Sequence, residues 1–439
     1  MADWKALARK IEQYEPISVC GLVSKISGLL VEADGPRVSV GKYCHIMASN
    51  FKAIPAEVAG FRGTKTLLMP LGELEGVAPG DKVVPQDETL NVKVGPELLG
   101  RILDGLGQPL DGRPLNTDQL YPLHNKPPSA LFRPRICEPL NVGVRGIDGL
   151  LTMGRGQRMG IFAGSGVGKS TLLGMMARNS EADVNVIALV GERGRELRDF
   201  MEKDLGEEGL SRSVIVVATS DQPALVRLKA AFTATAVAEY FRDKGKNVLF
   251  MMDSVTRFAM AQREIGLTIG EPPATRGYPP SVFAMLPKLL ERVGLSEKGS
   301  ITGIYTVLVD GDDHNEPIAD AVRGILDGHI VLTRELAAKN HYPSIDILQS
   351  ISRLMSDVAD PQVRELAGKI REHLAVYHEA KDLIDIGAYV EGSSNRIDQA
   401  IKHHEKIRAF VCQNTDEKCC FDEMLSFMKD IFEESDKDK

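Results

Sequence analysis

The spacing of hydrophobic positions changes along the chain, and its first long stretch is typical of β structure. From Ile17 to about Val94, short apolar runs are interrupted at close intervals by Gly, Pro, Asn and Asp. Short strands separated by such turn residues predict a small β-barrel or sandwich. We therefore expect a β-barrel domain over residues 17–94.

Longer apolar runs alternate with helical patterns between about residues 157 and 333. The strand-like runs read QRMGIFA, VNVIALV, SVIVVATS, NVLFMMD, SITGIYTVLV and HIVLT, and helix candidates lie at 168–179, 194–204 and 223–243. Strands that are apolar on both faces and separated by helices predict a parallel sheet covered by helices on both sides. We expect an α/β domain over residues 95–358, in which 95–114 and the Pro-rich 120–139 form irregular connecting structure.

The two ends of the chain carry helical patterns. Beyond residue 358 the strand-like runs stop, and long amphipathic segments broken near Gly387 and Gly392 predict a helical domain over residues 359–439. At the other end, apolar positions at helical spacing predict an amphipathic helix within residues 1–16. The pattern leaves open whether that helix packs on its own domain or docks on a partner.

Composition narrows the class of protein. A chain of 439 residues with 43% hydrophobic and 26% charged residues is expected to fold into several globular domains. The net charge of −8 provides no basic surface for nucleic acid, and no apolar run approaches the length of a membrane span. We expect a cytoplasmic protein whose six cysteines, none in a C-x-x-C pair, are free thiols.

A phosphate-binding loop is the strongest chemical motif. The segment GIFAGSGVGKSTLL has an apolar strand before it and a helical pattern after it, which is the context that such a loop requires. Its backbone N–H groups and Lys169 are expected to hold phosphates, while Ser170 is placed to ligate Mg²⁺. Ala163 replaces the usual first glycine, where a small side chain suffices. The predicted nucleotide contacts are Gly164, Ser165, Gly166, Val167, Gly168, Lys169, Ser170 and Thr171.

Two acidic residues follow other predicted strands. Asp253 ends the run NVLFMMD, where a carboxylate assists Mg²⁺ binding in proteins with this loop. Glu192 follows VNVIALV and is placed to orient or deprotonate an attacking water. Spacing alone does not separate that role for Glu192 from a solvated turn residue.

Several longer segments together resemble one family. GRILDGLGQPLDGRP, VGERGREL, MMDSVTRFAMAQREIG, GEPPATRGYPPSVFAMLPKLLER and HYPSIDILQSISRLMSDV, with the phosphate loop, occur in the order and spacing of the type III secretion ATPases. These are relatives of the catalytic subunits of rotary ATP synthases. The resemblance is most specific from about 95 to 358, and it implies a central RecA-like ATPase domain.

The resemblance assigns roles to residues around the phosphates. It implies that Glu192 is the catalytic glutamate, that Arg193 contacts the γ-phosphate, and that Glu196 and Arg257 surround Mg²⁺ and its waters. The substrate and cofactor that it implies are ATP and Mg²⁺. The segment around Glu271, Arg276 and Tyr278 would face a central channel, or else form a Pro-stiffened turn.

Two further residues bear on assembly. Tyr342 resembles the aromatic residue that stacks on adenine, and Arg353 resembles the arginine finger that enters a neighbour's site. Because Glu192 and Arg353 occur in the same chain, each copy can donate and accept a finger, which favours a closed ring of identical subunits, six by the family's pattern.

The resemblance implies an ATPase that energises protein export. The flagellar export ATPase is the better match, and the injectisome ATPase is the second. The resemblance further implies stalk and regulator proteins of the export apparatus and chaperone–cargo complexes as partners, and peripheral association with the inner face of the cytoplasmic membrane. Three alternatives remain: a hexameric RNA helicase, a rotary ATP synthase subunit, or a regulatory nucleotide-binding subunit. Nearly balanced charge in the first 90 residues argues against the helicase, the lack of a dense acidic run near residues 379–401 argues against the synthase, and Glu192 argues against a purely regulatory subunit.

Overall fold

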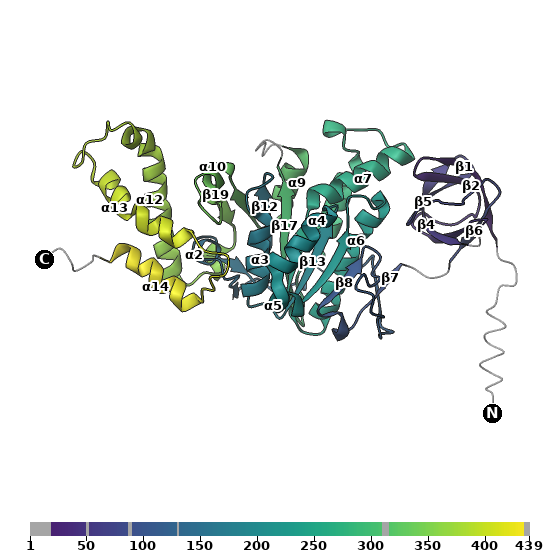
Figure 1. Cartoon of the computed structure of the whole chain (residues 1–439), viewed down its shortest axis with the longest axis horizontal. Coiled ribbons are helices and arrows are strands. Elements are labelled where there is room, and N and C mark those ends of the chain that lie inside the picture. Colours follow the sequence, from purple (N-terminus) through teal and green to yellow (C-terminus); the bar gives the residue numbers. More distant parts are fainter. Residues whose placement is uncertain (1–18, 50–51, 87–89, 130, 310–315, 434–439) are drawn as a thin grey trace, which may run out of the picture. The chain divides into compact units, whose positions relative to one another are not determined.

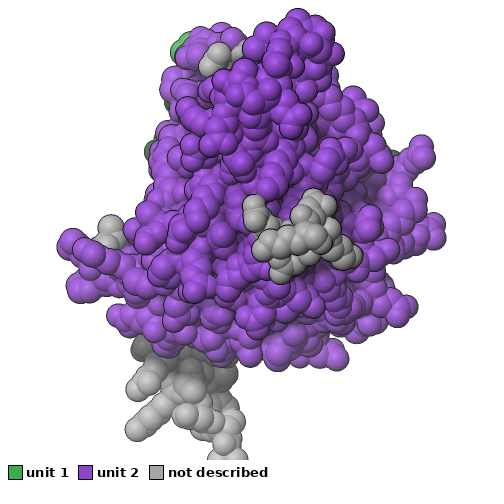
Figure 2. Space-filling view, turned by 90° about the vertical axis from the view of Figure 1, so that its left-hand side faces the viewer, with its two compact units in different colours: residues 1–91, 223–226, 264–272 green, residues 92–222, 227–263, 273–439 purple. Residues whose placement is uncertain are grey.

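A computed structural model describes residues 19–49, 52–86, 90–129, 131–309 and 316–433. It contains two compact units, one made of residues 1–91, 223–226 and 264–272, the other of residues 92–222, 227–263 and 273–439 (Figure 2). The helix expected within residues 1–16 lies outside the described part of the chain. None of the described helices is long and apolar enough to cross a membrane.

The first unit contains a closed barrel, in the order β1-β2-β5-β4-β3-β6 (Figure 1). Every pairing around it is antiparallel, so successive side chains alternate between the interior and the outside. In β4, for example, Ile54, Ala56 and Val58 point inward and are buried. The predicted β-barrel is confirmed. Its strands are β1 Gly21–Ser27, β2 Leu30–Asp34, β3 Tyr43–Met47, β4 Ala53–Arg62, β5 Lys65–Pro70 and β6 Lys82–Pro85.

The second unit is built on a sheet with the order β19-β18-β12-β17-β15-β13-β14-β8, and β16 pairs with β17 at its side. All neighbours along this order are parallel except β18 and β19, which are antiparallel. The predicted parallel sheet is therefore confirmed. The strands are β8 Arg101–Asp104, β12 Arg158–Ala163, β13 Val184–Val190, β14 Ser213–Ala218, β15 Asn247–Asp253, β16 Gly294–Leu295, β17 Ser300–Leu308, β18 Gly328–Leu332 and β19 Ile345–Ser352. Two further two-stranded sheets pair β7 Asn91–Lys93 with β9 Leu120–Pro122 and β10 Pro139–Leu140 with β11 Met153–Gly154.

Both edges of this sheet differ from the sequence prediction. Residues 95–114, expected to be irregular, contribute β8, which pairs in parallel with β14. The run is only four residues long, too short for the pattern to separate it from a loop. Its first residue, Arg101, is fixed by Asp111 at 2.5 Å. On the other edge, β19 was not predicted, because a register shift against β18 breaks the alternation of buried and exposed positions.

Helices follow the strands and cover the sheet. The candidate at 194–204 is divided into α4 and a π-helical turn at Phe200–Leu205. The candidates at 168–179 and 223–243 correspond to α3 and α6. The helices are α2 Arg145–Leu150, α3 Lys169–Asn179, α4 Gly194–Asp199, α5 Gly206–Ser211, α6 Ala224–Asp243, α7 Val255–Ile269, α8 Pro280–Leu290, α9 Pro317–Ile325, α10 Arg334–Ala338 and α11 Met355–Val358.

The predicted C-terminal helices are present and share a core with the sheet. They are α12 Pro361–Asp385, α13 Asn395–Val411 and α14 Phe421–Phe432, and they pack around the short helix α2 (Figure 1). Ile147 and Leu150 of α2 belong to the same buried apolar cluster as Phe410, Met424 and Met428. Because this apolar cluster continues into the sheet, the helices and the sheet form one compact unit.

A buried ion pair ties the Pro-rich connection to this unit. The Arg292 guanidinium donates to both carboxylate oxygens of Glu239 at 2.9 and 2.7 Å, and it also donates to the carbonyl of Leu123 at 2.6 Å. Asn125 donates to the same carboxylate at 3.3 Å. Since Arg292 is 1% exposed and Glu239 is 0% exposed, neither charge has water as an alternative partner.

We predict that Glu239→Ala lowers the free energy of unfolding of this unit by about 3–5 kcal/mol, because it leaves the Arg292 charge buried and unpaired. Urea unfolding followed by far-UV circular dichroism would measure this loss of unfolding free energy. Glu365→Ala, which removes the exposed partner of Lys369, is the matched control and should leave the unfolding midpoint unchanged. Equal midpoints for the two variants would contradict the prediction.

Candidate functional site

The predicted phosphate loop joins the end of β12 to the start of α3. Ala163 is the last residue of the strand and is buried, as its small size allows. Gly166 and Gly168 have φ angles of 79° and 87°, a left-handed conformation that favours glycine. Gly168 caps α3, whose first residue is Lys169. The loop therefore brings its N–H groups and a helix N-terminus together, as an anion site requires.

Two carboxylates lie beside Lys169. Its Nζ is 2.5 Å from Oδ1 of Asp253 and 3.9 Å from Oε1 of Glu192. Asp253 ends β15 and Glu192 follows β13, and these parallel strands are neighbours in the sheet. Asp253 is 4% exposed and Glu192 8% exposed, so both are largely removed from water. The structure thus brings together the three groups that the sequence placed at separate strand ends.

Arg257, on α7, completes this cluster. Its Nε lies 3.1 Å from Oε1 of Glu192. The approach is possible because Gly191, with a φ of +71°, has no side chain, and a Cβ there would lie 3.0 Å from Cδ of Arg257. Two cationic groups therefore face two carboxylates.

The burial of the cluster changes the acidity of Glu192. Burial raises its pKa to about 7, the nearby Asp253 charge adds to the rise, and Lys169 and Arg257 oppose it. A hydrogen bond that protonated Glu192 donates to the Glu196 carboxylate also raises the pKa. A carboxyl group with a pKa near neutrality can accept a proton and release it again at physiological pH.

Sequence reasoning missed Thr306, which holds Asp253 in place. The Thr306 hydroxyl donates to Oδ1 of Asp253 at 2.7 Å from the adjacent strand β17. Thr306 is fully buried within an apolar run, so the pattern gave no signal that its hydroxyl has a polar partner at the site.

Arg193 and Glu196 lie beside the cluster at the start of α4. Their side chains are 75% and 52% exposed and pair with each other at 3.4 Å between Nη1 and Oε1. Arg193 is directed to solvent in this structure, and its role toward the γ-phosphate stays a prediction.

Tyr342 lines a cavity of about 570 Å³ together with Gly168 and Thr171 of the phosphate-loop region. Tyr342 is 43% exposed. The hydroxyl of Ser344 donates to the carbonyl of Val167 at 2.6 Å, which fixes the Tyr342 segment to the loop. The N–H of Gln413 donates to the carbonyl of Tyr342 at 2.9 Å. The sequence gave no indication that the C-terminal part of the chain closes this cavity.

The residues present fit a Mg²⁺ ion only in combination with phosphates. Among the described residues there is no group of three or more His, Cys, Asp or Glu side chains that could hold a metal. Ser170 and Asp253 offer a hydroxyl and a carboxylate oxygen next to the loop, which suit an ion that takes its remaining ligands from phosphates and water.

Arg353 is not part of this cluster. It follows β19, which is antiparallel to β18 with Ser352 opposite Gly328, so Arg353 lies at the edge where the parallel strands begin. The phosphate loop lies at the opposite edge, on the order of 20 Å away along the six residues of β12. Arg353 is exposed there. The Arg353 side chain therefore cannot reach Lys169 of the same chain.

The expectation that Tyr278 faces a channel is wrong for this chain. Tyr278 is 5% exposed, and the guanidinium of Arg263 lies 5.2 Å from the centre of its ring. The ring is therefore part of the core.

The prediction that the six cysteines are free thiols is confirmed.

Three family models match successive parts of the chain. Residues 23–86 match the β-barrel domain of the ATP synthase alpha/beta family, and residues 143–352 match its nucleotide-binding domain. Residues 359–430 match the T3SS EscN ATPase C-terminal domain.

Whole proteins show the same relationship. The flagellum-specific ATP synthase of Bacillus subtilis is 56% identical over 96% of this chain and 97% of its own length. The type 3 secretion system ATPase of Xanthomonas euvesicatoria is 50% identical over 94% of each. The assembled ATPase EscN of the enteropathogenic E. coli type III secretion system superposes with a TM-score of 0.89, at 46% identity, over 94% of this chain and 99% of EscN. With the phosphate loop, the paired carboxylates and this similarity over nearly the whole chain, the protein belongs to the family of flagellar and type III secretion ATPases.

Proposed function

We propose that this protein hydrolyses ATP with Mg²⁺ in a ring of identical subunits, six by the family's pattern, and so energises protein export in the flagellar type III system. The observation that carries the proposal is the group of Lys169, Glu192, Asp253 and Arg257 around the phosphate loop, in which both carboxylates are buried. A chain that only bound nucleotide would not need a buried glutamate with a pKa near 7 beside the phosphates.

The loop and Lys169 hold the phosphates of ATP. In this structure Lys169 donates to Asp253, so a triphosphate in the loop competes with that carboxylate for the same ammonium group. Ser170 and Asp253 would hold the Mg²⁺ ion, with Glu196 nearby, and the bound ion would neutralise charge on the phosphates. Tyr342 stacks on the adenine from the cavity next to Thr171.

Glu192 acts on the attacking water. Its carboxylate is kept in place by Arg257, and its raised pKa suits a group that accepts a proton during the reaction. Arg193, at the adjacent start of α4, contacts the γ-phosphate after turning from its partner Glu196.

Arg353 serves the site of a neighbouring copy. It lies at the sheet edge opposite its own phosphate loop, and it is exposed. A head-to-tail ring joins the two edges of successive copies, so that every interface contains one complete site. The related EscN has been solved as an assembled ATPase, which supports this arrangement.

A stalk protein is a further partner that we propose. EscN has also been solved in complex with its central stalk EscO, with a TM-score of 0.87 to this chain. At the end of α12 and in the turn that leads to α13, Leu383, Ile386 and Val390 are 49%, 75% and 70% exposed, which is unusual for apolar side chains so close together. We assign this turn as the contact for a stalk. Regulator proteins, chaperone–cargo complexes and peripheral membrane association are further parts of the proposal.

Glu192→Gln should retain ATP binding and lose turnover by about 10²-fold or more, because the amide cannot take a proton from water. Phosphate release and fluorescent-nucleotide binding would measure the two properties. Glu297→Gln, in a turn away from the site, is the control and should behave as wild type. Full turnover in Glu192→Gln would remove Glu192 from its proposed role.

The same variant tests the cellular function. Placed in the native cell, Glu192→Gln should stop release of flagellar rod, hook and filament proteins into the medium. Loss of host-directed effectors with normal flagella would instead assign the chain to an injectisome, the second candidate, which the similarity to EscN favours.

Arg353→Ala should reduce turnover by about 10³-fold or more while ATP affinity stays within twofold, because a finger stabilises charge in the transition state. Specific activity of the wild-type protein should also rise with protein concentration. Arg396→Ala, which removes an exposed arginine of α13, is the matched control. Turnover that is independent of concentration would contradict a shared site.

Tyr342→Ala should weaken ATP binding by about tenfold or more, the loss expected for one stacked base, whereas Tyr342→Phe should bind as wild type. Binding of a fluorescent ATP analogue to each variant would provide both dissociation constants. Equal affinity for wild type and Tyr342→Ala would place the adenine elsewhere.

A further inference from the structure

The backbone around Arg353 is attached to the sheet at two points. The N–H of Arg353 donates to the carbonyl of Asp327 at 3.0 Å. The hydroxyl of the preceding residue, Ser352, donates to the carbonyl of Thr152 at 2.9 Å. The direction in which the exposed Arg353 side chain leaves the sheet therefore depends on Asp327 and Ser352.

The side chain of Gln157 contacts both of these residues. Its Nε2 donates to the Asp327 carbonyl at 3.2 Å and to the Ser352 hydroxyl at 3.1 Å. Its Oε1 accepts from the N–H of Gly154 at 2.8 Å, which fixes the orientation of the amide. Gln157 is 0% exposed, so water offers no replacement for these bonds.

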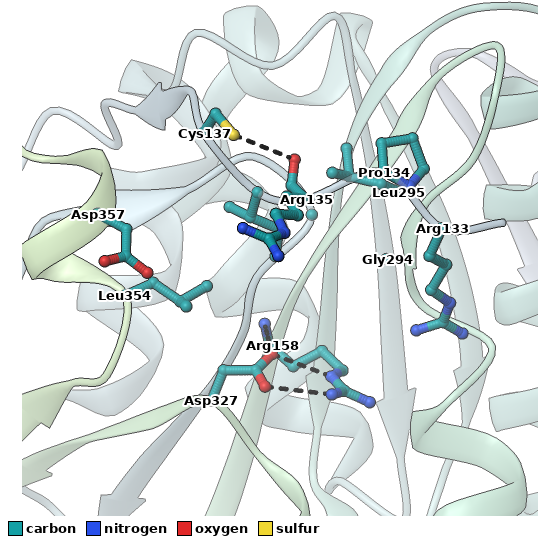
Figure 3. A pocket seen from close by; sticks show the side chains of 12 residues that line it. Arg133, Pro134, Arg135, Cys137, Arg158, Gly294, Leu295, Asp327, Leu354 and Asp357 are labelled. Carbon is teal, nitrogen blue, oxygen red and sulfur yellow. Dashed lines mark hydrogen bonds and ion pairs between the residues drawn. The ribbon is translucent and has the colours of Figure 1, made fainter. Parts of the chain in front are cut away.

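The segment that follows Arg353 borders a cavity. A cavity of about 520 Å³ lies under this part of the chain, and Leu354, Asp357, Arg158 and Asp327 are among its lining residues (Figure 3). Arg158 donates to the carboxylate of Asp327 at 3.1 and 3.2 Å, which fixes Asp327 from the cavity side. Hydrogen bonds to Asp327 and Ser352 therefore set the position of the Arg353 backbone, while its guanidinium donates to the carbonyl of Arg323 at 3.4 Å.

Gln157 is remote from the phosphate loop of its own chain. It precedes β12, whose other end carries that loop, and none of its hydrogen bonds reaches the Lys169 cluster. The hydrogen bonds of the Gln157 side chain to Asp327 and Ser352 both lie at the sheet edge that carries Arg353.

We propose that Gln157 is a positioning residue for Arg353, and that it acts on hydrolysis in the neighbouring copy's site rather than in its own. The inference rests on the proposed function, in which Arg353 works between subunits. The buried amide of Gln157 links Ser352 and the Asp327 carbonyl to the turn before β12. It thereby fixes the backbone position from which the Arg353 side chain extends.

Gln157→Met keeps the length of the side chain and removes its amide. We expect kcat to fall by about 10²-fold, the loss that a misplacement of about 1 Å can cause, with an unchanged KM for ATP. The matched control is Thr302→Val. Thr302 is 1% exposed and its hydroxyl accepts from the N–H of Gly156 at 2.8 Å, so it holds the same turn through a different hydrogen bond from those of Gln157. An equal fall in kcat for both variants, or wild-type kcat in Gln157→Met, overturns the proposal.

Mixed rings separate a defect in the donated finger from a defect in the receiving site. A Gln157→Met subunit keeps Glu192, and a Glu192→Gln subunit keeps a well-placed Arg353. An equal mixture of the two full-length proteins should therefore complete about a quarter of the sites and recover turnover well above either variant alone. A mixture of Gln157→Met with Arg353→Ala should recover nothing.

The mixture of Arg353→Ala with Glu192→Gln is the reference. If it recovers turnover and the mixture of Gln157→Met with Glu192→Gln does not, Gln157 acts within its own subunit and the proposal is wrong. If the reference mixture itself stays inactive, the shared site of the proposed function fails, and the role of Gln157 fails with it.

Discussion

The carboxyl ends of β12, β13 and β15 meet at one edge of the sheet because these strands run in the same direction, and everything that the chain offers to a triphosphate depends on that alignment. Lys169, Glu192 and Asp253 come from segments far apart in the sequence. Each lies at or just after the carboxyl end of its own strand, which is enough to bring it to the others. The strand β19 runs antiparallel to its neighbour β18, so Arg353, which follows β19, lies at the opposite edge of the sheet.

The groups at the phosphate edge depend on one another electrostatically. Two carboxylates that are almost fully buried are tolerated because Lys169 and Arg257 face them, and because Thr306 donates to Asp253. Removing one cation would leave a buried negative charge without a partner, which proteins rarely accept. Burial of the cluster, and after it the closeness of the two carboxylates, raises the pKa of Glu192, so stability and chemistry arise from the same arrangement.

Much of the fold could be predicted from the sequence, since the long buried strands and the amphipathic helices have clear periods. The phosphate loop and the strand-end residues Glu192 and Asp253 could be predicted for the same reason, because parallel strands bring their ends together. The short strand β8 and the irregular strand β19 could not, because four residues or a register shift leave no period to detect. The roles of Thr306 and Gln157 could not be predicted either, because the role of a buried polar side chain depends on its hydrogen-bond partners, which the sequence does not show.

The central claim is that one copy supplies Lys169 and Glu192 while the next supplies Arg353. An experimental structure of the assembled ring with Mg²⁺, ADP and aluminium fluoride, which mimics the transferred phosphoryl group, would test it most directly. The account predicts the guanidinium of Arg353 within hydrogen-bond distance of the fluoride group in the neighbour's site, opposite Glu192 of that neighbour. An Arg353 side chain directed to solvent, or toward the site of its own chain, would contradict it.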